Sequence, residues 1–127
     1  MDKLLLIDDE PDILRVLSMS LKADGYHVVT AQNGPEGVAC FEKEKPDIVI
    51  TDIKIPGMDG IEVLKKIKTL NADTEVIIIT GHGDIENAIE ALKHGASDFI
   101  NKPVRDEALA IALDRAREKK ENRQQLK

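Results

Sequence analysis

Short apolar runs alternate along the chain with segments whose apolar residues recur every three or four positions. The apolar runs have the length of β-strands and lie near residues 3–8, 27–31, 47–52, 76–80 and 97–101. The segments between them have the spacing of amphipathic helices. The pattern therefore predicts five strand–helix units in succession.

Turn and capping residues mark where the five predicted helices begin and end. In chain order, the helices are expected from Pro11 to Asp24, from about Pro35 to Glu44, from Asp59 to Leu70, from an N-cap at Asp84 to His94, and from beyond Pro103 to Ala116. The predicted apolar face of the third helix includes Ile61, Val63, Leu64, Ile67 and Leu70. That of the fourth helix includes Ile85, Ala88, Ile89 and Leu92, and that of the fifth includes Leu109, Ile111, Ala112 and Leu113.

Alternating strands and helices require parallel strands joined by right-handed crossovers, and near-continuous apolar strands imply helices on both faces of the sheet. A closed barrel would need eight units and about twice this length. The expected fold is therefore α/β, a flavodoxin-like, doubly wound sheet of five parallel strands, in one domain over residues 1–117. Apolar spacing fails beyond Ala116, so residues 118–127 are expected either to extend the last helix into solvent or to begin a linker to an absent output domain.

Charge and composition limit the functions that fit the chain. The net charge of −6 conceals a basic end, because residues 114–127 carry six basic and three acidic residues and leave the remainder at −9. Such an acidic body disfavours direct binding to nucleic acid. The N-terminus is too short and too acidic for a secretory signal, and no segment has the apolar density of a membrane span, so a cytoplasmic location is expected. The single cysteine, Cys40, is interpreted as a small core residue.

Polar residues directly follow or end four of the predicted strands. They are Asp8 and Asp9, Asp52, Thr80, and Lys102. Open α/β sheets keep their chemistry at the carboxyl ends of the strands, so these groups are expected to converge. Clustered carboxylates repel one another, which either raises the pKa of one of them or recruits a cation, and an all-oxygen site favours Mg²⁺. With the charge offset, an Asp can attack phosphorus, while Thr80 and Lys102 bind phosphoryl oxygens and Gly81 leaves room for the backbone to approach.

Each of these residues taken alone has an ordinary explanation. Asp8 or Asp52 can simply cap the next helix, Thr80 can be a plain strand-end residue, and Lys102 can be a solvated side chain. Their combination at four strand ends favours a site. His27 and His94 are interpreted as structural, whereas His82 lies beside the expected site and stays open. The sequence contains neither a nucleotide-binding P-loop nor a dinucleotide-binding glycine motif.

Four motifs together resemble the receiver domains of response regulators in two-component signalling, and the resemblance covers residues 3 to about 117. The motifs are Leu-Leu-Ile-Asp-Asp-Glu, Ile-Thr-Asp-Ile-Lys-Ile-Pro-Gly-Met-Asp-Gly, Ile-Ile-Thr-Gly-His-Gly and Asp-Phe-Ile-Asn-Lys-Pro. Residues 80–85 and 95–99 are similar to receivers of the NtrC-like transcription activators. Those proteins usually continue into an ATPase module that works with the sigma-54 form of RNA polymerase.

The resemblance implies a role for each matching residue. Asp52 would be the phosphoacceptor, taking its phosphoryl group from a sensor histidine kinase. Asp9 and Asp52 would ligate Mg²⁺ together with the backbone carbonyl of Lys54, and Asp8 would act largely through water. Thr80 and Lys102 would bind phosphoryl oxygens, and the Lys102–Pro103 peptide bond would be cis. The chain would then be a regulatory phosphoacceptor and not an enzyme acting on a separate substrate.

Two residues depart from the common receiver pattern. Gly81 stands where many receivers have Ala, which is expected to admit water and shorten the phosphoryl lifetime. Phe99 stands where Tyr is commoner, so a switching aromatic and a plain half-buried strand residue are both open. Phosphorylation is expected to repack residues 81–104 and change a surface of the fourth helix, fifth strand and fifth helix, with an output domain or protein as partner and a homodimer as a candidate readout. Ile85, Ile89 and Ala112 are candidate contacts there, although each also fits the core.

Two other functions compete with the phosphorylation switch. A Mg²⁺-dependent phosphatase would also form an aspartyl phosphate, but such enzymes generally have an acid–base carboxylate two residues after the nucleophile, where this chain has Lys54. A stand-alone interaction module would use the fold without being phosphorylated. The full set of acidic residues with Lys102 disfavours that alternative.

Overall fold

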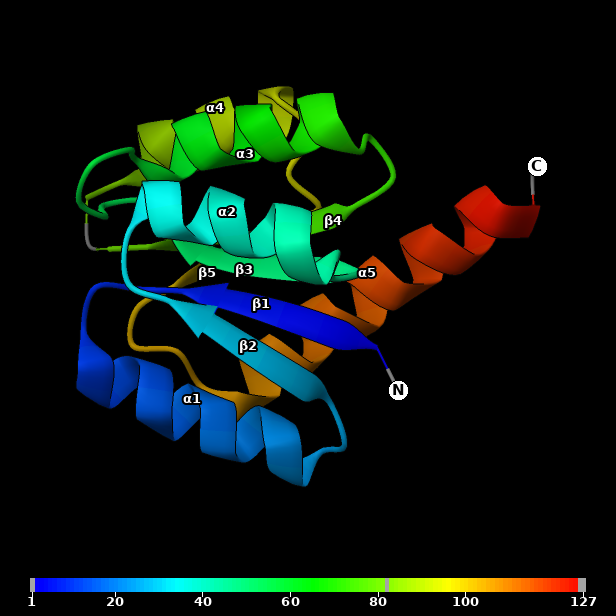
Figure 1. The fold of residues 1–127 in the computed structure, drawn as a ribbon, viewed down its shortest axis with the longest axis horizontal. Coiled ribbons are helices and arrows are strands. Elements are labelled where there is room, and N and C mark those ends of the chain that lie inside the picture. Colours follow the sequence, from blue (N-terminus) through cyan, green and yellow to red (C-terminus); the bar gives the residue numbers. More distant parts are fainter. Residues whose placement is uncertain (1, 82, 126–127) are drawn as a thin grey trace.

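The computed structural model describes residues 2–81 and 83–125, in which five strands and five helices alternate (Figure 1). The strands are β1 (Lys3–Ile7), β2 (His27–Ala31), β3 (Ile48–Asp52), β4 (Glu75–Thr80) and β5 (Asp98–Asn101). The helices are α1 (Pro11–Ala23), α2 (Gly34–Glu44), α3 (Gly60–Leu70), α4 (Ile85–Lys93) and α5 (Asp106–Gln125). All strands are parallel, in the order β2-β1-β3-β4-β5, which confirms the predicted fold class.

The strand order reverses at β1, and this reversal positions the site. The chain passes from β1 outward to β2 and then returns to place β3 on the other side of β1. In this register Ile7 lies opposite Thr51, so the residues that follow them, Asp8 and Asp52, emerge at the same edge. The loops after β1 and β3 diverge toward opposite faces, which opens a crevice at this edge.

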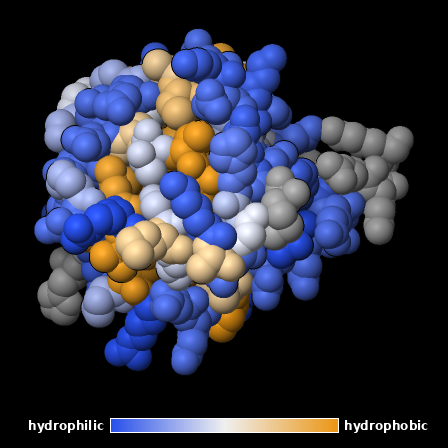
Figure 2. All heavy atoms as spheres, turned by 60° about the horizontal axis from the view of Figure 1, so that its bottom comes forward, coloured by the Kyte–Doolittle hydropathy of each residue, from blue (hydrophilic) through white to orange (hydrophobic). Residues whose placement is uncertain are grey.

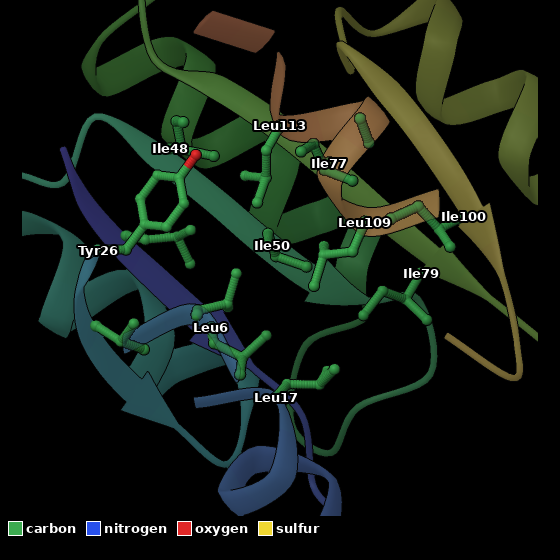
Figure 3. Packing of buried hydrophobic residues seen from close by; sticks show 14 of the residues in the cluster. Leu6, Leu17, Tyr26, Ile48, Ile50, Ile77, Ile79, Ile100, Leu109 and Leu113 are labelled. Carbon is green, nitrogen blue, oxygen red and sulfur yellow. The ribbon is translucent and has the colours of Figure 1, made fainter. Parts of the chain in front are cut away.

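The sheet has a separate hydrophobic core on each face because successive strand residues point to opposite sides. Leu4 and Leu6 of β1 pack with the face covered by α1 and α5, whereas Leu5 and Ile7 pack with the opposite face. Figure 3 shows the first core, where Leu17 of α1 and Leu109 and Leu113 of α5 meet side chains of the central strands. Figure 1 shows α2, α3 and α4 together on the other face. Both cores hold the strand ends rigidly in place.

The apolar face predicted for α4 differs from the one observed. The helix buries the small residues Ala88 and Ala91 against its neighbours, which leaves the larger apolar side chains outside. Assigning Ile85 and Ile89 to the core is therefore wrong, since their side chains are 57% and 49% exposed, whereas Ala112 is buried as expected. Other predicted interior residues that are exposed are Leu70, Leu92 and Ile111.

The polar segment beyond Ala116 continues α5 to Gln125 and is attached to the domain by polar contacts. Lys119 Nζ donates to the backbone carbonyl of Ser97 at 2.6 Å. Lys120 Nζ lies 2.9 Å from Asp47 Oδ1 and 3.3 Å from Asp2 Oδ1. The segment is thus a helical extension as far as Gln125. That a linker to an output domain begins here stays a prediction.

Candidate functional site

Four strand ends bring charged residues to one cavity, as the sequence predicts. A cavity of about 330 Å³ is lined by Asp9, Glu10, Asp52, Lys54, Gly81, Asp84 and Lys102. Asp8 lies buried beside these residues, directly after β1. Thr80 is buried at the end of β4 and does not line the cavity, although its neighbour Gly81 does. The residues predicted at the strand ends therefore lie together at this edge, although Thr80 is buried beneath the cavity lining.

Asp52 is held by two donors at the end of β3. Its Oδ1 accepts the backbone N–H of Lys54 at 3.2 Å, and its Oδ2 accepts Lys102 Nζ at 2.6 Å. Lys102 Nζ also lies 3.7 Å from Glu10 Oε1. Burial by itself lowers the pKa of Lys102, but its bond to Asp52 and the surrounding carboxylates outweigh burial and raise that pKa. Lys102 therefore stays charged and neutralises one carboxylate of the cavity.

Asp8 is a fully buried carboxyl group, and only one of its two oxygens accepts a hydrogen bond from the part of the chain that the structure describes. Oδ1 accepts the backbone N–H of Glu10 at 3.0 Å, while Oδ2 has no hydrogen-bond partner among the described residues. Burial, together with the nearby charge of Asp52 and against the lowering effect of the Glu10 N–H, raises the pKa of Asp8 from its usual 3.8 to about 6. A cation beside Asp8 would relieve this unfavourable charge.

Asp8, Asp9 and Glu10 form a carboxylate cluster suited to a hard cation. Each offers one carboxylate oxygen, and the three oxygens lie within 4.8 Å of one another. The unpartnered Oδ2 of Asp8 fits such a site, because all-oxygen donors are what Mg²⁺ prefers. The ligands expected from the resemblance were Asp8, Asp9, Asp52 and the backbone carbonyl of Lys54, and Glu10 was not among them. Its position directly after two aspartates at a strand end was the available signal.

Side chains at the ends of β4 and β5 make contacts that sequence reasoning missed. The Thr80 hydroxyl donates to Asn101 Oδ1 at 2.7 Å. Gly81 N donates to Asp84 Oδ2 at 3.2 Å, and Asp84 Oδ1 lies 3.3 Å from Lys54 Nζ. Asp84 does stand at the N-cap of α4, but its carboxylate makes no capping hydrogen bond. No local signal linked Thr80 to Asn101, which is 21 residues away, whereas Gly81 and Asp84 are neighbours in the same loop.

The remaining candidate residues have simpler surroundings. Phe99 of β5 is half-buried and packs against the core beneath α3 and α4, which leaves both of its predicted roles open. Cys40 is half-buried against the same core. His27 is exposed and His94 pairs with Glu90 at 3.0 Å, both away from the cavity, whereas His82 lies outside the described residues. The Lys102–Pro103 peptide bond is cis, as the resemblance implies.

Comparison with known families accounts for this arrangement of residues. The sequence matches the family described as "Response regulator receiver domain" over residues 4–114. The chain belongs to the response-regulator receiver family. Receivers are regulatory domains that generally depend on Mg²⁺, and the carboxylate cluster of this receiver fits that dependence.

Relatives of this receiver are transcriptional regulators. It is 42% identical over 115 residues to the transcriptional regulatory protein GlrR of Escherichia coli (strain K12), and 39% identical over 116 residues to the C4-dicarboxylate transport transcriptional regulatory protein DctD of Pseudomonas aeruginosa. Each match covers 91% of this chain but 26% and 25% of those proteins. The chain thus spans about a quarter of the length of the curated relatives it matches. They agree with the resemblance to NtrC-like activators.

Solved structures show the same fold over the whole receiver. A receiver domain protein from Clostridium thermocellum superposes with a TM-score of 0.90 at 41% identity, covering 99% of this chain and 98% of that one. NtrX from Brucella abortus in complex with ADP superposes with a TM-score of 0.93 at 32% identity, covering 98% of this chain and 29% of that one. Among the described residues, no helix has the length and apolar character needed to cross a membrane.

Proposed function

We propose that this receiver is a phosphorylation switch in which Asp52 is the phosphoacceptor. The observation that carries the proposal is the placement of Asp52, which lines an open cavity while its Oδ2 pairs with Lys102. Asp52 combines a fixed orientation with access to that cavity. A phosphoryl group arriving there meets a cation that can pair with its oxygens.

The transfer requires little beyond positioning and charge neutralisation. A carboxylate oxygen of Asp52 attacks the phosphorus of a phosphohistidine. The P–N bond breaks, and its electron pair stays on the imidazole, which takes up a proton from solvent. The product is an aspartyl phosphate, and the Lys102 ammonium moves from the carboxylate to a phosphoryl oxygen.

The acidic residues of the cavity supply the metal site in this proposal. Asp9, Asp52 and the backbone carbonyl of Lys54 would hold Mg²⁺ directly, with Asp8 acting through water. Glu10, which belongs to the same carboxylate cluster, is a further candidate. The bound cation would supply positive charge that lets an anionic donor approach the carboxylates. Without it, the cavity has more acidic than basic residues along its lining.

The donor kinase must reach Asp52, and an apolar groove adjoins the cavity. The groove has a volume of about 660 Å³, shares Glu10, Gly81 and Lys102 with the cavity, and is otherwise lined by Asp12, Ile13, Val16, Leu17, Pro103 and Val104. Val16 and the nearby Met19 on α1 are strongly exposed. Figure 2, which brings the side of α1 forward, shows apolar side chains exposed among charged ones. We infer that the sensor histidine kinase contacts this groove.

The output of the switch is proposed to act through α4, β5 and α5. Ile85 and Ile89 of α4 and Ile111 of α5 expose large apolar side chains that a partner or a second phosphorylated copy can bury. Regulation of transcription by an attached output domain is proposed from the named roles of the relatives GlrR and DctD.

Intact mass after incubation with acetyl phosphate and Mg²⁺ tests the proposal. We expect one phosphoryl adduct on the wild type, dependent on Mg²⁺, with a mass increase of about 80 Da that corresponds to one added HPO₃ unit. Asp52→Asn should give no adduct, whereas Asp59→Asn, which changes an exposed N-cap of α3, should behave as wild type. No adduct and no turnover of acetyl phosphate would favour the interaction module. Sustained turnover of phosphate esters would favour the phosphatase.

A further inference from the structure

Two hydrogen-bond donors at the end of β4 are already satisfied by side chains of this chain. The Thr80 hydroxyl donates to Asn101 Oδ1 at 2.7 Å, and Gly81 N donates to Asp84 Oδ2 at 3.2 Å. Both donors lie beside Asp52, because Thr80 follows the β4 residue that pairs with Asp52, and Gly81 lines the same cavity. A phosphoryl group on Asp52 presents strong acceptor oxygens to these donors.

Asp84 is placed to oppose a phosphoryl group by its charge as well as by its hydrogen bond. Its carboxylate lines the cavity together with Asp52, and its residue is only 8% exposed. Although Asp84 heads α4, the carboxylate makes no capping bond to that helix. Its Oδ2 instead accepts Gly81 N–H at 3.2 Å, and its Oδ1 lies 3.3 Å from Lys54 Nζ. The carboxylate of Asp84 therefore interacts with residues that line the cavity and does not cap α4.

We propose that Asp84 and Asn101 are internal competitors of the phosphoryl group. They hold the Gly81 N–H and the Thr80 hydroxyl in the unphosphorylated protein, and they set how tightly the site binds a phosphoryl group. This inference rests on the proposed role of Asp52. Both are positioning residues, since they act through the donors. Lys54 moderates the competition by neutralising part of the charge of Asp84.

The competition connects the site to the elements that are expected to move. Asp84 stands at the head of α4, and Asn101 is the last residue of β5. When phosphoryl oxygens take over the two donors, Asn101 loses its bond to Thr80 and Asp84 loses its bond to Gly81, so one side-chain link from β5 and one from α4 to the end of β4 are removed. Exchanging one acceptor for another is nearly neutral in free energy, so deleting the internal acceptor favours the phosphoryl state.

The affinity for beryllofluoride at saturating Mg²⁺ tests the inference. This anion binds a carboxylate as a phosphoryl group does, and its dissociation constant is measured by fluorine NMR. A net hydrogen bond corresponds to about 0.5–1.5 kcal/mol, so Asp84→Ala and Asn101→Ala should each tighten binding about two- to tenfold. Asp84→Asn keeps an acceptor but removes the charge, and should tighten binding to a smaller extent.

Two matched controls separate competition from damage to the fold. Asp59→Ala and Asn33→Ala each remove a genuine N-cap bond, made by Asp59 to Glu62 N at 2.9 Å and by Asn33 to Glu36 N at 2.8 Å. These variants should lower the unfolding temperature and leave the beryllofluoride affinity unchanged. Damage to the site would weaken binding, whereas competition predicts tighter binding.

Lys54→Met separates the effect of the negative charge of Asp84 from the effect of its hydrogen bond to Gly81 N. The Lys54 side chain pairs with Asp84, and the substitution keeps the backbone carbonyl. We expect about twofold weaker binding in the wild-type background and no change in the Asp84→Ala background. Unchanged or weaker binding in folded Asp84→Ala and Asn101→Ala would overturn the inference while the role of Asp52 stands. A wild type that binds no beryllofluoride with Mg²⁺ would overturn both.

Discussion

Replacing Asp8 by Asn should stabilise the metal-free protein although it weakens the metal site. The Asp8 carboxyl is fully buried, and burial raises its pKa to about 6 from the usual 3.8. Since one pKa unit corresponds to 1.36 kcal/mol, keeping this group ionised at pH 7 costs about 3 kcal/mol of folding free energy. Asn removes that cost and keeps the acceptor for Glu10 N.

Part of this gain is offset by the new amide. The NH₂ group of Asn replaces Oδ2, which has no hydrogen-bond partner among the described residues, and an unpaired buried donor costs about 1–2 kcal/mol. The net stabilisation at pH 7 is therefore expected to be about 1–2 kcal/mol, or about 3–8 °C in unfolding temperature. The assay is thermal and urea unfolding in EDTA, repeated with Mg²⁺. Added Mg²⁺ should stabilise the wild type far more than the variant.

The pH dependence of the stabilisation by Asp8→Asn tests whether it comes from removing the buried charge of Asp8. The folded protein holds the Asp8 proton more strongly than the unfolded chain, so this group favours folding below about pH 4, its usual pKa range. That contribution falls as the pH rises and is lost above about pH 6. The advantage of Asp8→Asn should therefore grow between pH 4 and 6 and then stay level. Asp9→Asn, at an exposed position of the same cluster, should change stability by less than about 0.5 kcal/mol. No gain in EDTA, or a gain independent of pH, would refute the reasoning.

Three further predictions concern the end of α5, the start of α3 beside Asp52 and the exposed face of α4. Lys120→Met should speed hydrogen exchange in residues 117–122 and cost at most about 1 kcal/mol, since its ion pairs are partly exposed. Burial by itself raises the pKa of Asp47, but the hydrogen bonds from Lys120 and Lys3 N outweigh burial and hold that pKa below its usual value. The loss of stability caused by Lys120→Met should therefore disappear as the pH falls below about 4, where Asp47 becomes protonated. Gly60→Ala should cost about 1–3 kcal/mol in urea unfolding and slow adduct formation, because its Cβ would lie 2.4 Å from the Asp52 carbonyl oxygen. Ile89→Asp should prevent phosphorylation-dependent dimerisation in sedimentation experiments without slowing adduct formation, since this side chain is exposed.

Each of these predictions has a control in the same chain. Lys43→Met changes an exposed lysine of α2 and should leave exchange at the end of α5 unaltered. Gly37→Ala meets only the Ile7 side chain, so it should disturb Asp52 less than Gly60→Ala does. Glu42→Gln, on the outer side of α2, should leave any dimer intact. If a variant and its control changed the measured quantity equally, the contact or exposed surface from which that prediction is derived would not be the cause of the change.

The identity of the strands and the edge that carries the chemistry could be predicted from local pattern. Apolar runs such as Val76–Ile79 are too short and too continuous for a surface helix, and the alternation with helices requires parallel strands. Parallel strands in one sheet end at the same edge, so polar residues after four strands had to lie near one another. The pairing of Lys102 with Asp52, 50 residues apart, follows from this topology.

The partners of individual side chains required the tertiary structure. Asp8 and Asp9 are adjacent in sequence directly after β1, yet Asp8 is fully buried and Asp9 is exposed. The apolar pattern of α4 placed Ile85 and Ile89 inside, whereas the helix packs through its alanines. A helical pattern gives the relative positions of side chains around one axis. The rotation of that axis against the sheet depends on every element packed beside it.

The sequence by itself determined the fold class, the family and the five polar residues that gather at one edge of the sheet: Asp8, Asp9, Asp52, Thr80 and Lys102. These depend on local periodicity and on motifs, which are properties of neighbouring residues. Only the tertiary structure decided that Thr80 bonds to Asn101 and that Lys54 pairs with Asp84. A hydrogen bond requires its donor and acceptor to lie about 3 Å apart, which is less than the spacing of two residues along the chain. Its formation therefore depends on the strand register and on the path of each loop, and local sequence pattern specifies neither.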